Sequence, residues 1–141
     1  TGEVARLLRL DFVVEKNEEV LQGLINDHYY KDNIIYTSPR MCLKHPGVFY
    51  PVPHNPLLVQ PLILPYLAAF DGHKEVFLLG YTDSEIMGQD AWAIQLEDIV
   101  KTYSATKFYH VGHKSLTPNA LKNYANFAQL DYREFITYCD I

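Results

Sequence analysis

The pattern of apolar and polar positions divides the chain into short strands and helices. Four runs rich in apolar or β-branched residues, bounded by Asn, Asp or Gly, predict buried strands: Leu7–Glu15, Ile34–Thr37, Glu75–Leu79 and Lys107–Val111. Val48–Tyr50 is a shorter candidate strand before the Pro-rich segment. Turn-forming residues separate these runs, so each predicted strand has a defined carboxyl end.

Helices are predicted between and after the strands, over Asn17–Asp27, Leu57–Phe70, Asp90–Tyr103 and Asp131–Cys139. Asn17 is a favourable N-cap for the first helix. Pro61 and Pro65 predict a kink in the second, and Asn55-Pro56 suggests its start. The third has its candidate core at Trp92, Ile94, Leu96, Ile99 and Val100, and the last at Phe135, Ile136 and Tyr138.

The alternation of strands and helices predicts an α/β fold, and the expected architecture is a Rossmann-like three-layer sandwich. Its sheet would be mostly parallel, with about four or five strands. The 141 residues suit a single α/β domain over 1–141. The chain begins at Thr1 and not at Met, which is compatible with a fragment of a longer chain.

Composition and charge limit the classes of partner that we expect this protein to bind. A net charge of −5 argues against nucleic-acid binding, which depends on Lys and Arg neutralising phosphates. The apolar stretch Leu57–Leu67 is interrupted by prolines and too short to span a membrane, and no signal peptide is visible. Cys42 and Cys139 match no metal or redox spacing, so we expect two reduced thiols and a cytoplasmic location.

Polar residues follow the predicted strands at the edge where open α/β sheets bind ligands. The candidate binding and catalytic residues at this edge are Thr37, Ser38, Arg40, Gly80, Tyr81, Thr82, Asp83 and His113. Arg40 has the chemistry to bind a phosphate, and Asp83 to accept from ribose hydroxyls or help bind a metal. Each has an ordinary structural alternative: Asp83 as a turn cap, Arg40 as a solvated surface charge, and Gly80 as relief of crowding.

His54, in a Pro-stiffened loop, is the candidate general base, with a structural loop histidine as the alternative. His110 and His113 lie three apart at a strand end and would point to opposite faces, which makes a poor metal pair. The sequence contains no zinc signature, P-loop, nucleophile elbow or Gly-x-Gly-x-x-Gly. We therefore expect neither a metal nor a cofactor.

Residues 34–83 resemble a segment of the bacterial sialyltransferases with a Rossmann-like fold that use a CMP-activated sugar, and of related uncharacterised proteins of carbohydrate biosynthesis. In these proteins a helix of small and apolar residues leads through a turn to a strand that ends in Gly-aromatic or Gly-x-Asp. Leu67–Ala69, Gly72, Lys74–Gly80 and Asp83 match this outline, and Ile34–Pro39 matches it more loosely. The resemblance implies nucleotide-sugar binding and glycosyl transfer.

Three functions follow as hypotheses. The first is a nucleotide or nucleotide-sugar binding domain that transfers a sugar, with Arg40 on phosphate, Ser38 and Asp83 on hydroxyls and His54 as base. The second is a non-catalytic interaction or assembly domain with a homo-oligomer as a possible partner, because the family's Gly/Asn/Ser-rich nucleotide-binding turn does not occur in this sequence and tyrosines are numerous. The third is a hydrolase or lyase that acts on a small nucleotide.

Overall fold

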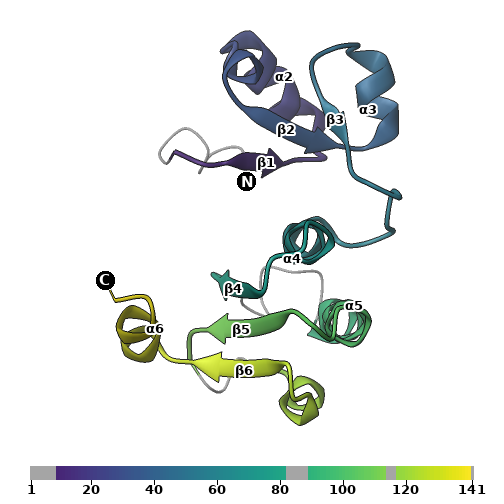
Figure 1. Ribbon diagram of the computed structural model, residues 1–141. Helices are drawn as coiled ribbons and strands as arrows, with labels where there is room; N and C mark the ends of the chain where they lie inside the picture. The colour runs from purple at the N-terminus through teal and green to yellow at the C-terminus, as the bar shows by residue number, and fades with distance from the viewer. Residues whose placement is uncertain (1–8, 82–88, 114–116, 141) are drawn as a thin grey trace. The chain divides into compact units, whose positions relative to one another are not determined.

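The computed structural model describes residues 9–81, 89–113 and 117–140. These residues group into two compact units, Thr1–Ile63 and Leu64–Ile141. Each unit contains its own three-stranded parallel sheet (Figure 1). The predicted mixed α/β fold with parallel strands is therefore confirmed, whereas the single sheet of four or five strands is wrong. Strand pairing is non-local, so the local pattern located strands without showing which of them pair.

The first unit alternates strands and helices. Its elements are β1 (Phe12–Val14), α2 (Glu18–Asn26), the 3-10 turn η1 (Tyr29–Lys31), β2 (Ile34–Thr37), α3 (Pro39–Lys44) and β3 (Tyr50–Pro51). The strand order is β1-β2-β3, with β2 in the middle. The predictions for β2 and α2 are confirmed. Helix α3 was not predicted, although Ser38-Pro39 is a typical helix start.

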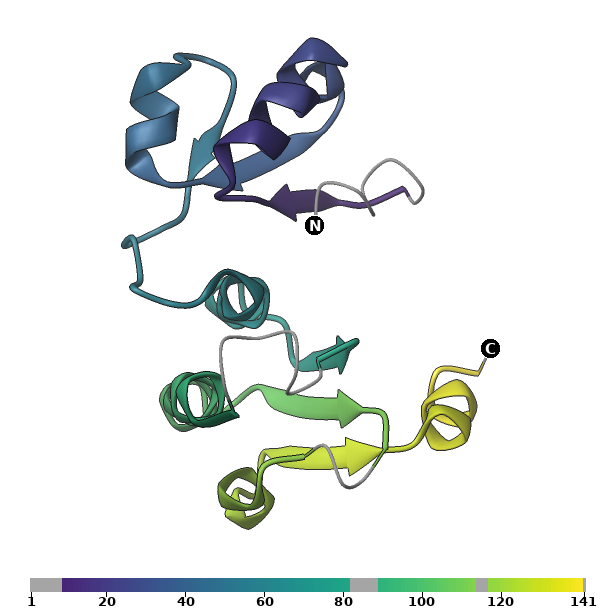
Figure 2. The same cartoon turned by 180° about the vertical axis from the view of Figure 1, so that it is seen from behind.

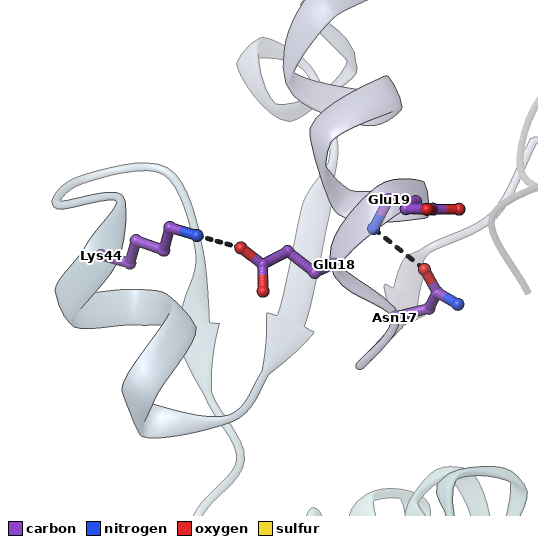
Figure 3. Close-up of polar contacts among 4 residues, drawn as sticks. All are labelled: Asn17, Glu18, Glu19 and Lys44. Atoms are coloured by element: carbon purple, nitrogen blue, oxygen red, sulfur yellow. Dashed lines mark hydrogen bonds and ion pairs between the residues drawn. The ribbon is translucent and has the colours of Figure 1, made fainter.

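Capping and one ion pair fix the two helices of the first unit. The Asn17 side chain accepts hydrogen bonds from the backbone N–H groups of Glu19 (2.9 Å; Figure 3) and Val20 (3.2 Å). The Lys44 ammonium at the end of α3 contacts the Glu18 carboxylate at the start of α2. Lys44 lowers the pKa of Glu18, chiefly through this hydrogen bond. Both side chains are about half exposed, so the pair orients the helices more than it stabilises them.

Both helices lie on the same side of the first sheet (Figure 2). The buried residues Leu21 and Leu24 of α2, Ile35 of β2, Met41 of α3, and Phe49 form one apolar cluster. This arrangement follows from the alternation within β2, where Ile35 points into the cluster and its neighbours do not. The cluster holds the carboxyl end of β2 in place.

The side chain of Gln60 covers part of the outer edge of β1. Its Nε2 donates to the Val14 carbonyl (3.3 Å), and its Oε1 accepts from the Lys16 N–H (3.0 Å). The Lys16 ammonium also donates to the Leu58 carbonyl (3.3 Å). An edge strand otherwise exposes unpaired backbone groups, and one side-chain amide here takes the place of a neighbouring strand.

The second unit contains most of α4 (Gln60–Phe70), then β4 (Glu75–Leu79), α5 (Gln89–Thr102), β5 (Lys107–Val111), the 3-10 helix η3 (Asn119–Asn123), β6 (Phe127–Leu130) and α6 (Tyr132–Tyr138). The strand order is β4-β5-β6. The predictions for β4 and β5 are confirmed, and α4 contains Pro65 as expected. Strand β6 was not predicted, because its four residues FAQL hardly stand out from their surroundings.

Helices cover both faces of the second sheet, with α5 and α6 on opposite sides (Figures 1 and 2). On one face, Trp92 of α5 packs edge-on against His110, with ring centroids 6.1 Å apart. On the other, Phe77 stacks on Tyr109 at 4.8 Å, and Phe135 of α6 lies 5.3 Å from Phe77. The second unit is therefore a small three-layer structure in itself.

The predicted core of α5 and α6 is corrected at three positions. Trp92, Leu96, Ile99 and Val100 are buried, as expected, but Ile94 is 59% exposed. In α6, Ile136 and Tyr138 are also exposed, although the Tyr138 ring packs with one side against Phe77 and Tyr109 of the sheet.

Candidate functional site

The carboxyl edge of the first sheet carries three of the predicted site residues. Thr37 is the last residue of β2, and its carbonyl accepts from the Val52 N–H (3.3 Å). Ser38 occupies the N-cap position of α3, but its side chain makes no capping hydrogen bond. Arg40 lies in the first turn of α3 and is exposed. Two hydroxyls and a guanidinium, those of Thr37, Ser38 and Arg40, thus lie between the buried end of β2 and the exposed first turn of α3.

Sequence reasoning missed Glu15 at this edge. It follows β1 and is only 4% exposed, although charged residues are usually found at the surface. Its Oε1 accepts from the backbone N–H groups of Lys16 and Asn17, both at 2.9 Å. Its own N–H donates to the Tyr36 carbonyl (3.1 Å), which places Glu15 beside Thr37, one position beyond the Val14–Tyr36 pair. Its position directly after a strand is the sequence feature that could have identified Glu15 as a site residue.

His54 lies in the segment between β3 and α4 and is exposed. His54 and Asn55 both have left-handed backbone conformations, with φ of 59° and 43°. Such conformations are unfavourable for residues other than Gly and cost of order 1–3 kcal/mol each. The expected helix start at Asn55-Pro56 is wrong, because α4 begins at Gln60. The role of His54 as a base stays a prediction.

The carboxyl edge of the second sheet is formed by two glycines on neighbouring strands. Leu79 pairs with Val111, so Gly80 and Gly112 leave β4 and β5 side by side. Both have positive φ, 77° and 154°, and within the described residues no atom beyond the chain neighbours lies within 4 Å of the place where a Gly80 side chain would begin. The Gly112 N–H donates to the Leu130 carbonyl (2.9 Å), and its carbonyl accepts from Gln129 Nε2 (2.6 Å).

Buried His110 forms hydrogen bonds to two chain segments at this edge. Its Nε2 lies 2.8 Å from the Tyr81 carbonyl, and its Nδ1 lies 2.8 Å from Thr117 Oγ1. A carbonyl only accepts, so Nε2 carries the proton, and in the neutral ring Nδ1 accepts from the Thr117 hydroxyl. His110 thus links the exit of β4 to the chain that follows β5, and its geometry accounts for a structural role.

Tyr81 itself is 9% exposed, and burial raises the pKa of its hydroxyl. Its ring therefore belongs to the core, and its described contact at the edge is the carbonyl. His113, by contrast, is exposed directly after Gly112. The hydroxyl of Tyr132, a residue that sequence reasoning missed, lies 4.0 Å from where a side chain on Gly112 would begin. The Gly112–His113 exit is thus flanked by a tyrosine that is 59% exposed.

The predicted site residues are therefore distributed over two sheets. Thr37, Ser38, Arg40 and His54 belong to the first unit, and Gly80, Tyr81 and His113 to the second. Thr82 and Asp83 lie outside the described residues. The roles of all nine stay predictions.

Comparison with protein-family models, with curated proteins and with solved structures finds no match to this chain. Over the described parts of the chain, no helix has the length and hydropathy that a membrane crossing requires. Within the same residues, no three His, Cys, Asp or Glu side chains gather closely enough to hold a metal ion. The geometry of the two sheet edges is therefore what supports a functional proposal.

Proposed function

We propose that this protein binds a nucleotide or nucleotide-sugar and transfers the sugar to an acceptor hydroxyl, as a glycosyltransferase-like protein. The main support is the carboxyl edge of the second sheet, where Gly80 and Gly112 leave adjacent parallel strands beside the exposed His113. Open α/β sheets bind ligands outside the carboxyl ends of their strands, and glycines there let a phosphate approach the backbone.

The strand order supports the finer description of the fold as a Rossmann-like sandwich. In the first unit β1, α2, β2, α3 and β3 succeed one another with the sheet order β1-β2-β3. The second unit repeats this with β4, α5, β5, η3 and β6. A βαβαβ unit of this kind is the building block of nucleotide-binding doubly wound folds.

Under this proposal the candidate side chains of each unit have the roles that their own chemistry supports. Arg40 binds phosphate, because its guanidinium offers paired donors to two oxygens. Ser38 and Asp83 bind ribose or sugar hydroxyls, and His54 takes the proton of the acceptor hydroxyl. In the second unit, considered by itself, His113 is the candidate ligand-binding side chain at the exit of β5. An imidazole is suited to act as a base or as a ligand contact, because it can both donate and accept a hydrogen bond near neutral pH.

A thermal-shift panel of CMP, UDP, GDP and their sugar conjugates tests the proposal. A ligand present at a hundredfold excess over its Kd stabilises the folded state by about 2.7 kcal/mol. We expect one base family to raise Tm. The absence of any shift over the whole panel would refute nucleotide binding.

Two histidine variants locate the site. His113→Gln is expected to weaken the ligand-induced shift, whereas His73→Gln is not. His73 is also exposed and belongs to the same unit, but it precedes β4 at the opposite end of the sheet and faces Asp71 at 3.6 Å. Equal shifts for both variants would place the ligand elsewhere. In a transfer assay, His54→Gln is expected to lower kcat with little change in donor binding.

A non-catalytic interaction domain is the second candidate, and helix α6 favours it. Tyr132, Ile136 and Tyr138 are 47–59% exposed on this helix, and Leu79 of β4 is 49% exposed. Tyrosine and apolar side chains are enriched in protein interfaces. A homo-oligomer in sedimentation analysis that dissociates on Ile136→Lys, together with silence in the nucleotide panel, would favour this function.

A further inference from the structure

His54 and Asn55 are two successive left-handed residues in the segment that follows β3. Their φ angles are 59° and 43°, and neither is a glycine. Two other non-glycine residues with positive φ in the described parts of the chain, His28 and Asp140, each stand one position after the C-cap of a helix, α2 and α6. A left-handed residue is ordinary at that position. His54 and Asn55 follow a strand instead, so helix termination does not account for their conformation.

The chain around this pair forms a tight turn. The Val52 carbonyl accepts from the Asn55 N–H (3.1 Å), so His54 is the third residue of a four-residue turn, the 52–55 turn. A positive φ at this position is usually supplied by glycine. Asn55 precedes Pro56, and the residue before a proline favours an extended backbone with negative φ. The chain therefore has two strained residues where glycine would fit without strain.

The 52–55 turn is fixed to the carboxyl end of the first sheet. The Val52 N–H donates to the Thr37 carbonyl (3.3 Å) at the end of β2, and the Val52 side chain is 4% exposed. The preceding residue, Pro51, pairs with Thr37 in the register of β2 and β3. All of these residues belong to the first unit. The strained pair thus lies directly beyond the kind of edge where open α/β sheets bind ligands.

We infer that the 52–55 turn holds the His54 imidazole in place for catalysis, and that Asn55 is a positioning residue. This inference rests on the proposed function, in which His54 takes the proton of the acceptor hydroxyl. The acceptor oxygen then bonds the anomeric carbon of the sugar, and the nucleotide leaves with the electron pair of the bond that breaks. Strained backbone persists only where the surrounding structure enforces it, and such residues cluster at active sites.

The strain has a physical use at this position. Glycine would adopt the same φ without strain, but it would also allow the chain to leave this conformation. A general base must lie within hydrogen-bonding reach of the proton that it takes, and a displacement of about 1 Å can lower a rate about 100-fold. The two residues therefore lower the stability of the first unit and keep the imidazole fixed, as strained active-site residues often do.

His54→Gly and His54→Ala test the strain, because both remove the imidazole and only glycine relaxes the backbone. We expect the Tm of His54→Gly, followed by circular dichroism, to exceed that of His54→Ala by roughly 4–8 °C. Asn55→Gly should exceed Asn55→Ala by a similar amount. Equal Tm values in either pair, or a lower value for the glycine variant, would show that the backbone is not strained there and would overturn the inference.

Turnover separates positioning from stability. It is followed as release of CMP, UDP or GDP from the sugar conjugates of the panel, with water and a mixture of free mono- and disaccharides as acceptors. Asn55→Gly is expected to lower kcat by roughly 10- to 100-fold without a change in the KM for the donor. Added imidazole should restore part of the turnover of His54→Gly, whose base is missing, but not that of Asn55→Gly, whose base is present and displaced.

His28→Gly is the matched control. His28 is also an exposed histidine of the first unit, and its φ of 54° is close to that of His54. The variant should raise Tm by relaxing the backbone in the same way, with kcat unchanged. A loss of kcat in His28→Gly as large as that in Asn55→Gly would show a general effect of glycine and would reject the positioning role.

The failures of the two proposals can be distinguished. A wild-type protein that binds no member of the panel, or releases no nucleotide, overturns the proposed function and this inference with it. An active wild type with an Asn55→Gly variant of equal kcat overturns the inference alone. A His54→Gly variant that keeps full turnover, or that imidazole does not rescue, would reject His54 as the base and the inference with it, while nucleotide binding would stand.

Discussion

Replacement of His110 by phenylalanine is the most informative test of the second sheet's carboxyl edge. The ring is 1% exposed and holds the Tyr81 carbonyl and the Thr117 hydroxyl at 2.8 Å each. Phenylalanine fills a similar volume but bonds neither partner. Each buried group left without a hydrogen bond costs about 1–3 kcal/mol of stability. The burial of a more apolar ring offsets part of this loss. We expect a net loss of about 2–4 kcal/mol.

For a unit of this size, at roughly 4–8 °C per kcal/mol, the loss corresponds to a fall in Tm of roughly 8–32 °C. Trp92 is the only tryptophan of the chain and lies 6.1 Å from His110, so its fluorescence reports unfolding of the second unit. Far-UV circular dichroism, recorded in parallel, also follows the first unit, whose melting should not change if the two units unfold independently.

Thr117→Val completes a double-mutant cycle with His110→Phe. Thr117→Val alone removes one bond and should cost about 1 kcal/mol. In the background of His110→Phe its effect should be smaller by a similar amount, because the partner is already gone. Additive effects, or a His110→Phe variant as stable as the wild type, would show that His110 does not link the two strand exits.

Two further predictions concern individual contacts. Gln60→Met keeps the length of the side chain but cannot hydrogen-bond Val14 and Lys16. We expect the free energy of unfolding, measured in urea, to fall by about 1 kcal/mol. An unchanged midpoint would show that the amide does not protect β1. The Tyr124 hydroxyl (2.6 Å), followed by Lys101, lowers the pKa of Glu97 below 4.5. This contribution to the free energy of unfolding is present above the pKa of Glu97 in the unfolded state and is lost as pH falls through the lowered folded-state pKa. Tyr124→Phe should therefore reduce the decrease in stability at acidic pH. An unchanged decrease would contradict the assignment.

Much of the local structure could be predicted because it depends on neighbouring residues. Ile34–Thr37, Glu75–Leu79 and Lys107–Val111 are strands with the expected bounds, since each apolar run is closed by turn-forming residues. Asn17 caps α2 as its type and position indicated. Strand β6 was missed because four residues carry little periodicity, and its formation depends on pairing with β5.

The environment of single polar groups could not be predicted. Glu15 looks like an ordinary exposed carboxylate in the sequence, but two backbone N–H groups hold it in a buried position. Thr37 was identified as a site residue from its place at the end of a strand, whereas only the packed structure shows that its hydroxyl has no hydrogen-bond partner among the described residues. Tyr81 was identified in the same way, and its ring proved to be buried.

The sequence by itself determined where β2, β4 and β5 end and which side chains follow them, because strand ends depend on local propensity and turn residues. The tertiary structure decided that these ends belong to two three-stranded sheets. It also decided which of the polar groups there are buried, paired or exposed. Pairing and burial arise from contacts between residues far apart in the chain, and no local pattern encodes them.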